Sequence, residues 1–234
     1  MEIFRSCLIG AGLALASLAM VGCERRQATV KLPQIEVTDV PVPSQPAVVI
    51  RPGDVLNDLA ETAYGHENFS DFIQRFNGIA DVTRLQVGFQ LQTPSLAAAF
   101  QQKGLDARYQ PAVNALALAW TKLTKCLPDY ERARAESGAK DGNNFGLPKT
   151  LKSDLEDIVT TTTAVLQMLK NPAQGHTAPK SAILRLEEAL GMVRKLALGR
   201  VDSHDYDIFL TGDSYALVFD HLLIWVQTDY QRSK

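Results

Sequence analysis

Residues that build metal centres and disulfide frameworks are scarce in this chain. Its 234 residues include three cysteines and four histidines, and the histidines are scattered at positions 66, 176, 204 and 221. The motifs H-E-x-x-H and G-x-S-x-G and the paired Cys/His spacings of zinc sites are absent from the sequence. The linear signatures of zinc peptidases, serine hydrolases and zinc fingers are therefore missing. We expect no catalytic residues, no metal and no cofactor.

The chain also has no excess of basic charge. Lys and Arg number 24 against 26 Asp and Glu, which gives a formal net charge of −2. Domains that bind nucleic acid usually carry a basic face, so we expect no nucleic-acid partner. The segment VDSHDYD at 201–207 gathers acidic residues around one histidine but lacks the spacing of a calcium-binding loop. We interpret it as a polar loop between helices, with a divalent-cation site as the alternative.

The N-terminus has the pattern of a secretory signal. Arg5 precedes the apolar run CLIGAGLALASLAMVG, which is short of the roughly 20 residues that a spanning helix needs. The run ends in MVGC at 20–23, which resembles the lipobox of bacterial lipoproteins, with Met20 in place of the usual Leu. This resemblance implies that residues 1–22 are a signal peptide and that Cys23 is acylated (palmitate included) and anchors the chain to a membrane. An uncleaved signal anchor and a secreted protein with an incidental Cys23 are the alternatives.

Residues 23–46 have the composition of a linker. They contain four prolines, charges of both signs and no sustained apolar period. A polyproline-like chain advances by about 3 Å per residue, so this segment would reach about 70 Å. We therefore expect it to hold the following domain away from the membrane surface.

Residues 47–94 predict a small unit with the order strand, helix, helix, strand. A β-branched stretch at 47–50 leads into the turn Arg51–Asp54, in which Gly53 adopts a positive φ and Asp54 caps the first helix. The segment FSDFIQRFN places apolar residues at i, i+3, i+4 and i+7, as an amphipathic helix does. FQLQTP reads as a short second strand that Pro94 ends.

The remainder, residues 95–234, is helical by pattern. Apolar side chains recur at alternating steps of three and four residues in four segments, which begin at Val113, Leu151, Ile183 and Tyr215. Stretches rich in Gly, Pro and polar residues separate them. This pattern predicts a four-helix bundle. The predicted fold class is therefore α+β, with a small βααβ domain followed by an all-α domain.

The βααβ unit resembles the LysM family of carbohydrate-binding modules. The resemblance rests on VVIRPGDVLNDLA at 48–60, on Asn77 after the second helix and on LQVGFQLQTP at 85–94. Val48 stands where the family pattern has Tyr, Val55 where it has Thr, and Phe89 where it has Gln. Ser70 stands where an aromatic residue is common. The helical domain resembles no family that we recognise.

The LysM resemblance implies binding of glycans that contain N-acetylglucosamine, such as peptidoglycan. In that family the ligand lies in a shallow groove between the loop after the first strand and the loop after the second helix. The residues that this places in the site are Gly53, Asp54, Val55, Leu56, Asn57, Ile79, Ala80, Asp81 and Leu85. Gly53 and Asp54 are equally well explained by the turn and the cap, and Leu56 by the core.

Together these features predict a lipid-anchored protein of the bacterial cell envelope that binds peptidoglycan through one LysM module and is not an enzyme. Glu24 after the acylated cysteine favours the outer membrane, facing the periplasm, over the inner membrane. The helical domain would dock another envelope protein. The alternative is an assembly or regulatory scaffold in which the helical bundle carries the function and LysM only localises it. A wall-processing enzyme ranks behind both.

Overall fold

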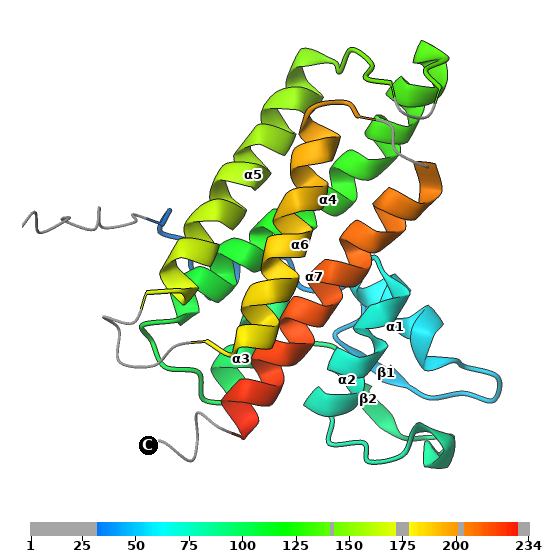
Figure 1. Cartoon of the computed structure of the whole chain (residues 1–234). Helices are drawn as coiled ribbons and strands as arrows, with labels where there is room; N and C mark the ends of the chain where they lie inside the picture. Colours follow the sequence, from blue (N-terminus) through cyan, green and yellow to red (C-terminus); the bar gives the residue numbers. More distant parts are fainter. Residues whose placement is uncertain (1–31, 141–142, 172–177, 201–203, 229–234) are drawn as a thin grey trace, which may run out of the picture.

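The computed structural model describes residues 32–140, 143–171, 178–200 and 204–228. These residues form seven α-helices, three short 3-10 turns and one two-stranded antiparallel sheet, which confirms the α+β class (Figure 1). The predicted signal peptide and Cys23 lie outside the described residues. Among the helices that the structure describes, none is long and apolar enough to cross a membrane.

Residues 47–94 form the predicted order of elements, and we refer to them as the βααβ module. Strand β1 (Ala47–Val49) and strand β2 (Gln90–Gln92) pair antiparallel, with Val48 opposite Leu91. Helices α1 (Leu56–Tyr64) and α2 (Ser70–Phe76) lie between them in the chain. The 3-10 turn Val82–Arg84 precedes β2.

The prediction that Asp54 caps the first helix is wrong. The N-cap of α1 is Val55, which has extended backbone and no side-chain capping bond. The Asp54 carboxylate instead accepts the N–H of Arg51 at 2.7 Å, and the N–H of Asp54 donates to the Arg51 carbonyl at 3.2 Å. Gly53 has the predicted positive φ, at +89°, as the third residue of a type II turn requires. Asp54 thus closes the turn and leaves the helix uncapped by a side chain.

The helical region, residues 95–228, contains the four predicted long helices and one short helix that the sequence did not predict. The short helix is α3 (Leu96–Gln102), and the long ones are α4 (Gln110–Ser137), α5 (Lys149–Leu169), α6 (Lys180–Ala197) and α7 (His204–Gln227). Along the chain, each long helix packs against the next (Figure 1). Aromatic pairs close the gap between α4 and α7, since Trp120 packs on Tyr215 with ring centroids 5.3 Å apart.

The βααβ module and the helical region share one hydrophobic core. The rings of Phe69 and Phe72 are fully buried, and Phe69 lies 5.6 Å from Trp120 and 5.9 Å from Phe219 between ring centroids. Phe72 in turn lies 6.0 Å from Phe100 of α3. The apolar face that the sequence predicts for α2 is therefore buried against the helical region. Position 94 does not separate two independent cores.

Polar contacts fix the orientation of the module on the helical region. Arg75 of α2 donates to both carboxylate oxygens of the buried Asp220 on α7, at 2.7 and 3.1 Å. These hydrogen bonds raise the pKa of Arg75. The indole N–H of Trp120 donates to the carbonyl of Tyr64 at 2.8 Å, at the end of α1. An ion pair with a buried carboxylate has strict geometry, so the module is held in one position.

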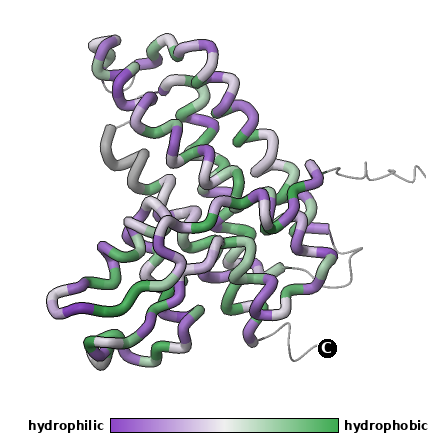
Figure 2. Tube along the Cα trace, turned by 180° about the vertical axis from the view of Figure 1, so that it is seen from behind, coloured by the Kyte–Doolittle hydropathy of each residue, from purple (hydrophilic) through white to green (hydrophobic). Residues whose placement is uncertain are grey.

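Residues 32–46 do not extend freely as the linker prediction requires. The segment crosses the face seen in Figure 2, where the buried Asn114 donates to the carbonyl of Ile35 at 2.7 Å. Val40 is buried in the shared core, and the N–H of Thr93 donates to the Pro46 carbonyl at 2.8 Å. The apolar residues between the prolines, too irregular to predict an element, hold the segment in place.

Candidate functional site

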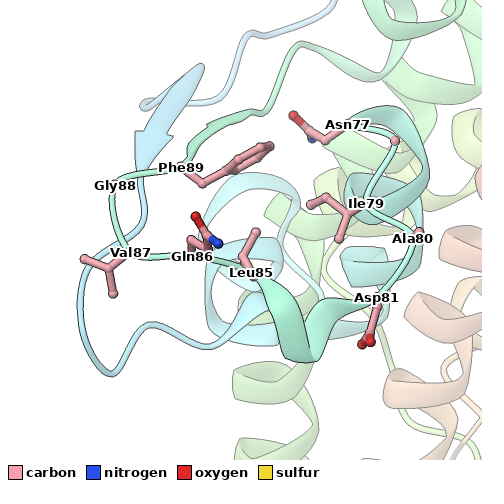
Figure 3. A pocket seen from close by; sticks show the side chains of 10 residues that line it. Asn77, Ile79, Ala80, Asp81, Leu85, Gln86, Val87, Gly88 and Phe89 are labelled. Carbon is pink, nitrogen blue, oxygen red and sulfur yellow. The ribbon is translucent and has the colours of Figure 1, made fainter.

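Two hollows lie at the outer end of the βααβ module, on either side of the loop before β2. The first, which we call the turn groove, has a volume of about 500 Å³ and lies between the turn after β1, the start of α2 and the loop before β2. The second, which we call the loop hollow, has a volume of about 570 Å³ and lies between Asn77–Asp81 and Leu85–Phe89 (Figure 3). Leu85 and Val87 line both.

The structure divides the predicted site residues between the two hollows. The turn groove contains the wall after β1, together with one residue of the opposite wall: Gly53, Asp54, Val55, Leu56, Asn57 and Leu85. The loop hollow contains the rest of the opposite wall: Ile79, Ala80, Asp81 and, again, Leu85. The structure thus has two hollows where the resemblance implies a single groove between two loops. The loop side of the turn groove is built by Val82, Thr83, Leu85 and Val87, and residues 79–81 do not line it.

The far wall of the turn groove includes residues that the sequence did not assign to a site. These are Ser70, Asp71, Gln74, Val82 and Thr83. Ser70 and Asp71 begin α2 and Gln74 lies one turn further along it, and the last two lie in the 3-10 turn before β2. Ser70 was visible in the sequence as a position where an aromatic side chain is common, and a small side chain there keeps this end of the groove open.

The turn groove combines polar groups with exposed apolar side chains. Val55 is 53% and Val87 is 63% exposed, and hydrophobic stretches are visible in the loops of the module in Figure 2. Asn57 brings an amide and Ser70 a hydroxyl, whereas the amide N–H₂ of Gln74 already donates to the Ile79 carbonyl at 3.1 Å. A few hydrogen-bonding groups among apolar contacts are typical of sites that bind small polar ligands. Such a groove can contact the face of a sugar ring and bond its hydroxyl and amide groups.

Asn77 holds the loop that borders the second hollow. Its side-chain N–H₂ donates to the carbonyls of Ile73 and Gln92, each at 2.9 Å, and its side-chain oxygen accepts the N–H of Gln92 at 2.8 Å. The amide therefore pairs with β2 as a neighbouring strand would. This is the physical reason for an asparagine at the end of α2.

Asp81 serves the loop and does not point into the hollow. Its carboxylate accepts the backbone N–H and the hydroxyl of Thr83, at 3.0 and 2.6 Å, and caps the 3-10 turn. These bonds hold the pKa of Asp81 below its usual value. Figure 3 shows its side chain directed away from the hollow.

The loop hollow is walled by three apolar side chains. Ile79, Leu85 and Phe89 point toward the same space, whereas Val87 points outward (Figure 3). Phe89, 38% exposed, follows Gly88, whose φ of +90° and N–H bond to the Ile50 carbonyl at 2.8 Å set the direction of the loop. Phe89 is a position at which the chain departs from the LysM pattern. The departure gives this hollow its aromatic wall.

The predicted polar loop at 201–207 begins outside the described residues, and its last four residues are the start of α7. Within the side chains that the structure describes, no group of three or more His, Cys, Asp or Glu lies close enough to hold a metal ion. Cys126 is buried and free. Its thiol has a raised pKa because of burial and the nearby carboxylates of Asp154 and Asp129.

Comparison with protein-family models, with curated proteins and with solved structures found no match to this chain.

Proposed function

We propose that this protein is a lipid-anchored protein of the bacterial cell envelope that binds N-acetylglucosamine-containing glycan, peptidoglycan in particular, in the turn groove of a LysM-like module. One observation carries the proposal. The wall after β1 that the resemblance implies, residues 53–57, and Leu85 of the opposite wall line one hollow of about 500 Å³. The βααβ order and the antiparallel β1–β2 pair support the same assignment.

A single shallow groove binds weakly, and anchoring compensates for weak binding. A tether raises the effective concentration of a site near a polymer that it can reach. Because residues 32–46 are part of the folded protein, they do not serve as a free tether between the proposed anchor and the module. The folded helical region itself separates the module from the start of the described chain. The two lie on opposite sides of this region in both whole-molecule views (Figures 1 and 2).

The helical region is proposed as the support that keeps the module folded and oriented. The shared core and the Arg75–Asp220 ion pair favour this role. Docking of another envelope protein on the helical region stays a prediction from the sequence.

Co-sedimentation with purified peptidoglycan sacculi tests the proposal. Val55→Glu places a charge in the turn groove, whereas Val49→Glu places the same charge on a β1 residue of nearly equal exposure, 55% against 53%, that lines neither hollow. We expect protein lacking residues 1–23 and its Val49→Glu variant to pellet with sacculi, and Val55→Glu to stay in solution. Failure of the unsubstituted protein to pellet, or pelleting of Val55→Glu at the same level, contradicts the proposal.

A further inference from the structure

We infer that the loop hollow is a second subsite, which takes a small aliphatic group carried by the bound glycan, so that the module prefers peptide-bearing peptidoglycan over an unsubstituted chain of N-acetylglucosamine. The inference rests on the proposed function of the turn groove. The loop hollow lies on the side of the loop 85–87 that faces away from the turn groove.

The two hollows lie on the two sides of the loop 85–87. Leu85 and Val87 line both of them, so only the loop 85–87 separates a ligand in the turn groove from the space beside Phe89. Val87 is 63% exposed and points outward in Figure 3. A substituent on a sugar in the turn groove therefore has a path to the loop hollow across an exposed apolar side chain.

The chemistry of the loop hollow differs from that of the turn groove. Its inward-pointing side chains are Ile79, Leu85 and Phe89 (Figure 3). Two of the polar side chains beside it are engaged within the protein, since Asn77 bonds the backbone of β2 and Asp81 caps the 3-10 turn, while the Gln86 amide also lines the hollow. A sugar ring in this hollow would meet one side-chain amide, that of Gln86, so most of its hydroxyls would lose water without replacement, which is unfavourable. An aliphatic group there removes apolar surface from water, which is favourable.

Peptidoglycan supplies such a group next to each N-acetylglucosamine. Every second sugar carries a lactyl ether whose peptide stem begins with an alanine, and both have methyl groups, whereas chitin-type chains have neither. A hollow of about 570 Å³ has room for both methyl groups. Phe89 is the residue that distinguishes this hollow from the LysM pattern, in which glutamine stands at the same position. Phe89 is thus the residue on which the preference depends.

The test compares three ligands and two variants by calorimetric titration. The ligands are a tetramer of N-acetylglucosamine, a peptide-free tetrasaccharide of peptidoglycan, and the same tetrasaccharide with its stems. Phe89→Gln removes the aromatic wall, and Val49→Gln is the control because Val49 is exposed in β1 and lines neither hollow. Thermal unfolding verifies that both variants fold.

The expected results follow from the size of the buried group. Each buried methyl group strengthens binding about 4-fold, so the stem-bearing ligand is expected to bind about 15-fold more tightly than the N-acetylglucosamine tetramer, and the peptide-free ligand about 4-fold. Phe89→Gln should abolish both preferences while the affinity for the tetramer stays unchanged. Val49→Gln should keep them.

Three results overturn the inference. Equal affinities for all three ligands leave the turn groove as the glycan site and remove the second subsite. A preference that survives Phe89→Gln places the substituent elsewhere. If Phe89→Gln changes the self-association of the protein, measured by sedimentation velocity, the hollow is a contact between two copies of this chain and not a subsite. Absence of binding to any ligand contradicts the proposed function itself.

Discussion

At the residue scale, the loops around both hollows depend on short polar side chains that bond the backbone. Asp54 closes the turn after β1, Asn77 ties the end of α2 to β2, and Asp81 caps the turn before β2. Each side chain replaces a backbone partner that the short strands do not supply. The shape of the candidate site is thus fixed by residues whose polar atoms are occupied within the protein.

Asn77→Asp tests this role of the amide. Aspartate keeps the shape but lacks the N–H₂ group that donates to Ile73 and Gln92, and its charge faces two carbonyls. We expect a loss of about 1–3 kcal/mol in the free energy of unfolding, the cost of leaving hydrogen-bonding groups without partners. Urea denaturation at neutral pH measures it. Asn57→Asp, at an exposed position in α1, is the control, and an equal effect of the two substitutions contradicts the role.

Local chemistry could be predicted from the sequence at this scale only in part. The positive φ of Gly53 follows from residue type, because few other residues adopt it. The hydrogen bond of Asp54 does not follow from residue type. A carboxylate at this position can accept an N–H of the turn or an N–H of the helix, because the two donors are only a few residues apart. The roles of Asn77 and Asp81 depend on which strand or turn lies opposite.

At the element scale, helix α2 is the element that joins the module to the helical region. It directs Phe72 into the shared core and Arg75 to the carboxylate of Asp220. The apolar spacing predicts that α2 buries one face, and this is confirmed. The neighbour on that face could not be predicted, because the periodicity of a helix carries no information on its packing partner. The short helix α3 escaped prediction because seven residues are too few to establish a period.

Arg75→Met tests the link between α2 and α7. The substitution leaves the Asp220 carboxylate, whose side chain is 7% exposed, without its cation, and we expect the free energy of unfolding to fall by about 1–3 kcal/mol, the cost of leaving a buried polar group without its partner. Arg132→Met is a matched control. Arg132 bonds Asp129 at the same 2.7 Å, but both side chains are more than half exposed, so its loss is expected to cost at most about 0.5 kcal/mol. Equal costs, by urea denaturation, would contradict a structural role for the buried pair.

At the scale of the whole molecule, the residues that the structure describes share one core, with the candidate site at one end. The composition of the sequence indicates a linker, a small domain and a helical domain, and the elements of the last two are present. Their separation could not be judged from the sequence, because Phe69 and Phe72 pack equally well in a small core or against a neighbour. The sequence predicts the site residues in the wall after β1. It does not predict those of α2, because they reach the groove only through the tertiary fold.

A shared core predicts a single unfolding transition. Removal of residues 47–94 would expose Trp120, Phe100 and Phe219, which are buried in the intact protein. We expect differential scanning calorimetry to show one cooperative transition for protein lacking residues 1–23, and none for a variant that also lacks 47–94. Two separate transitions in the first protein, or a cooperative transition in the second, would show that the module and the helical region fold independently. Point substitutions are therefore the appropriate tool for testing the site.

The most direct test of glycan binding in the turn groove is an NMR titration. Isotope-labelled protein lacking residues 1–23 is titrated with a peptide-free tetrasaccharide of peptidoglycan, and the backbone amide shifts are followed. The account predicts that the largest shift changes fall on residues 51–57, on the start of α2 and on 82–87, which line the groove. Shift changes confined to the helical region, or none at saturating ligand, would contradict it.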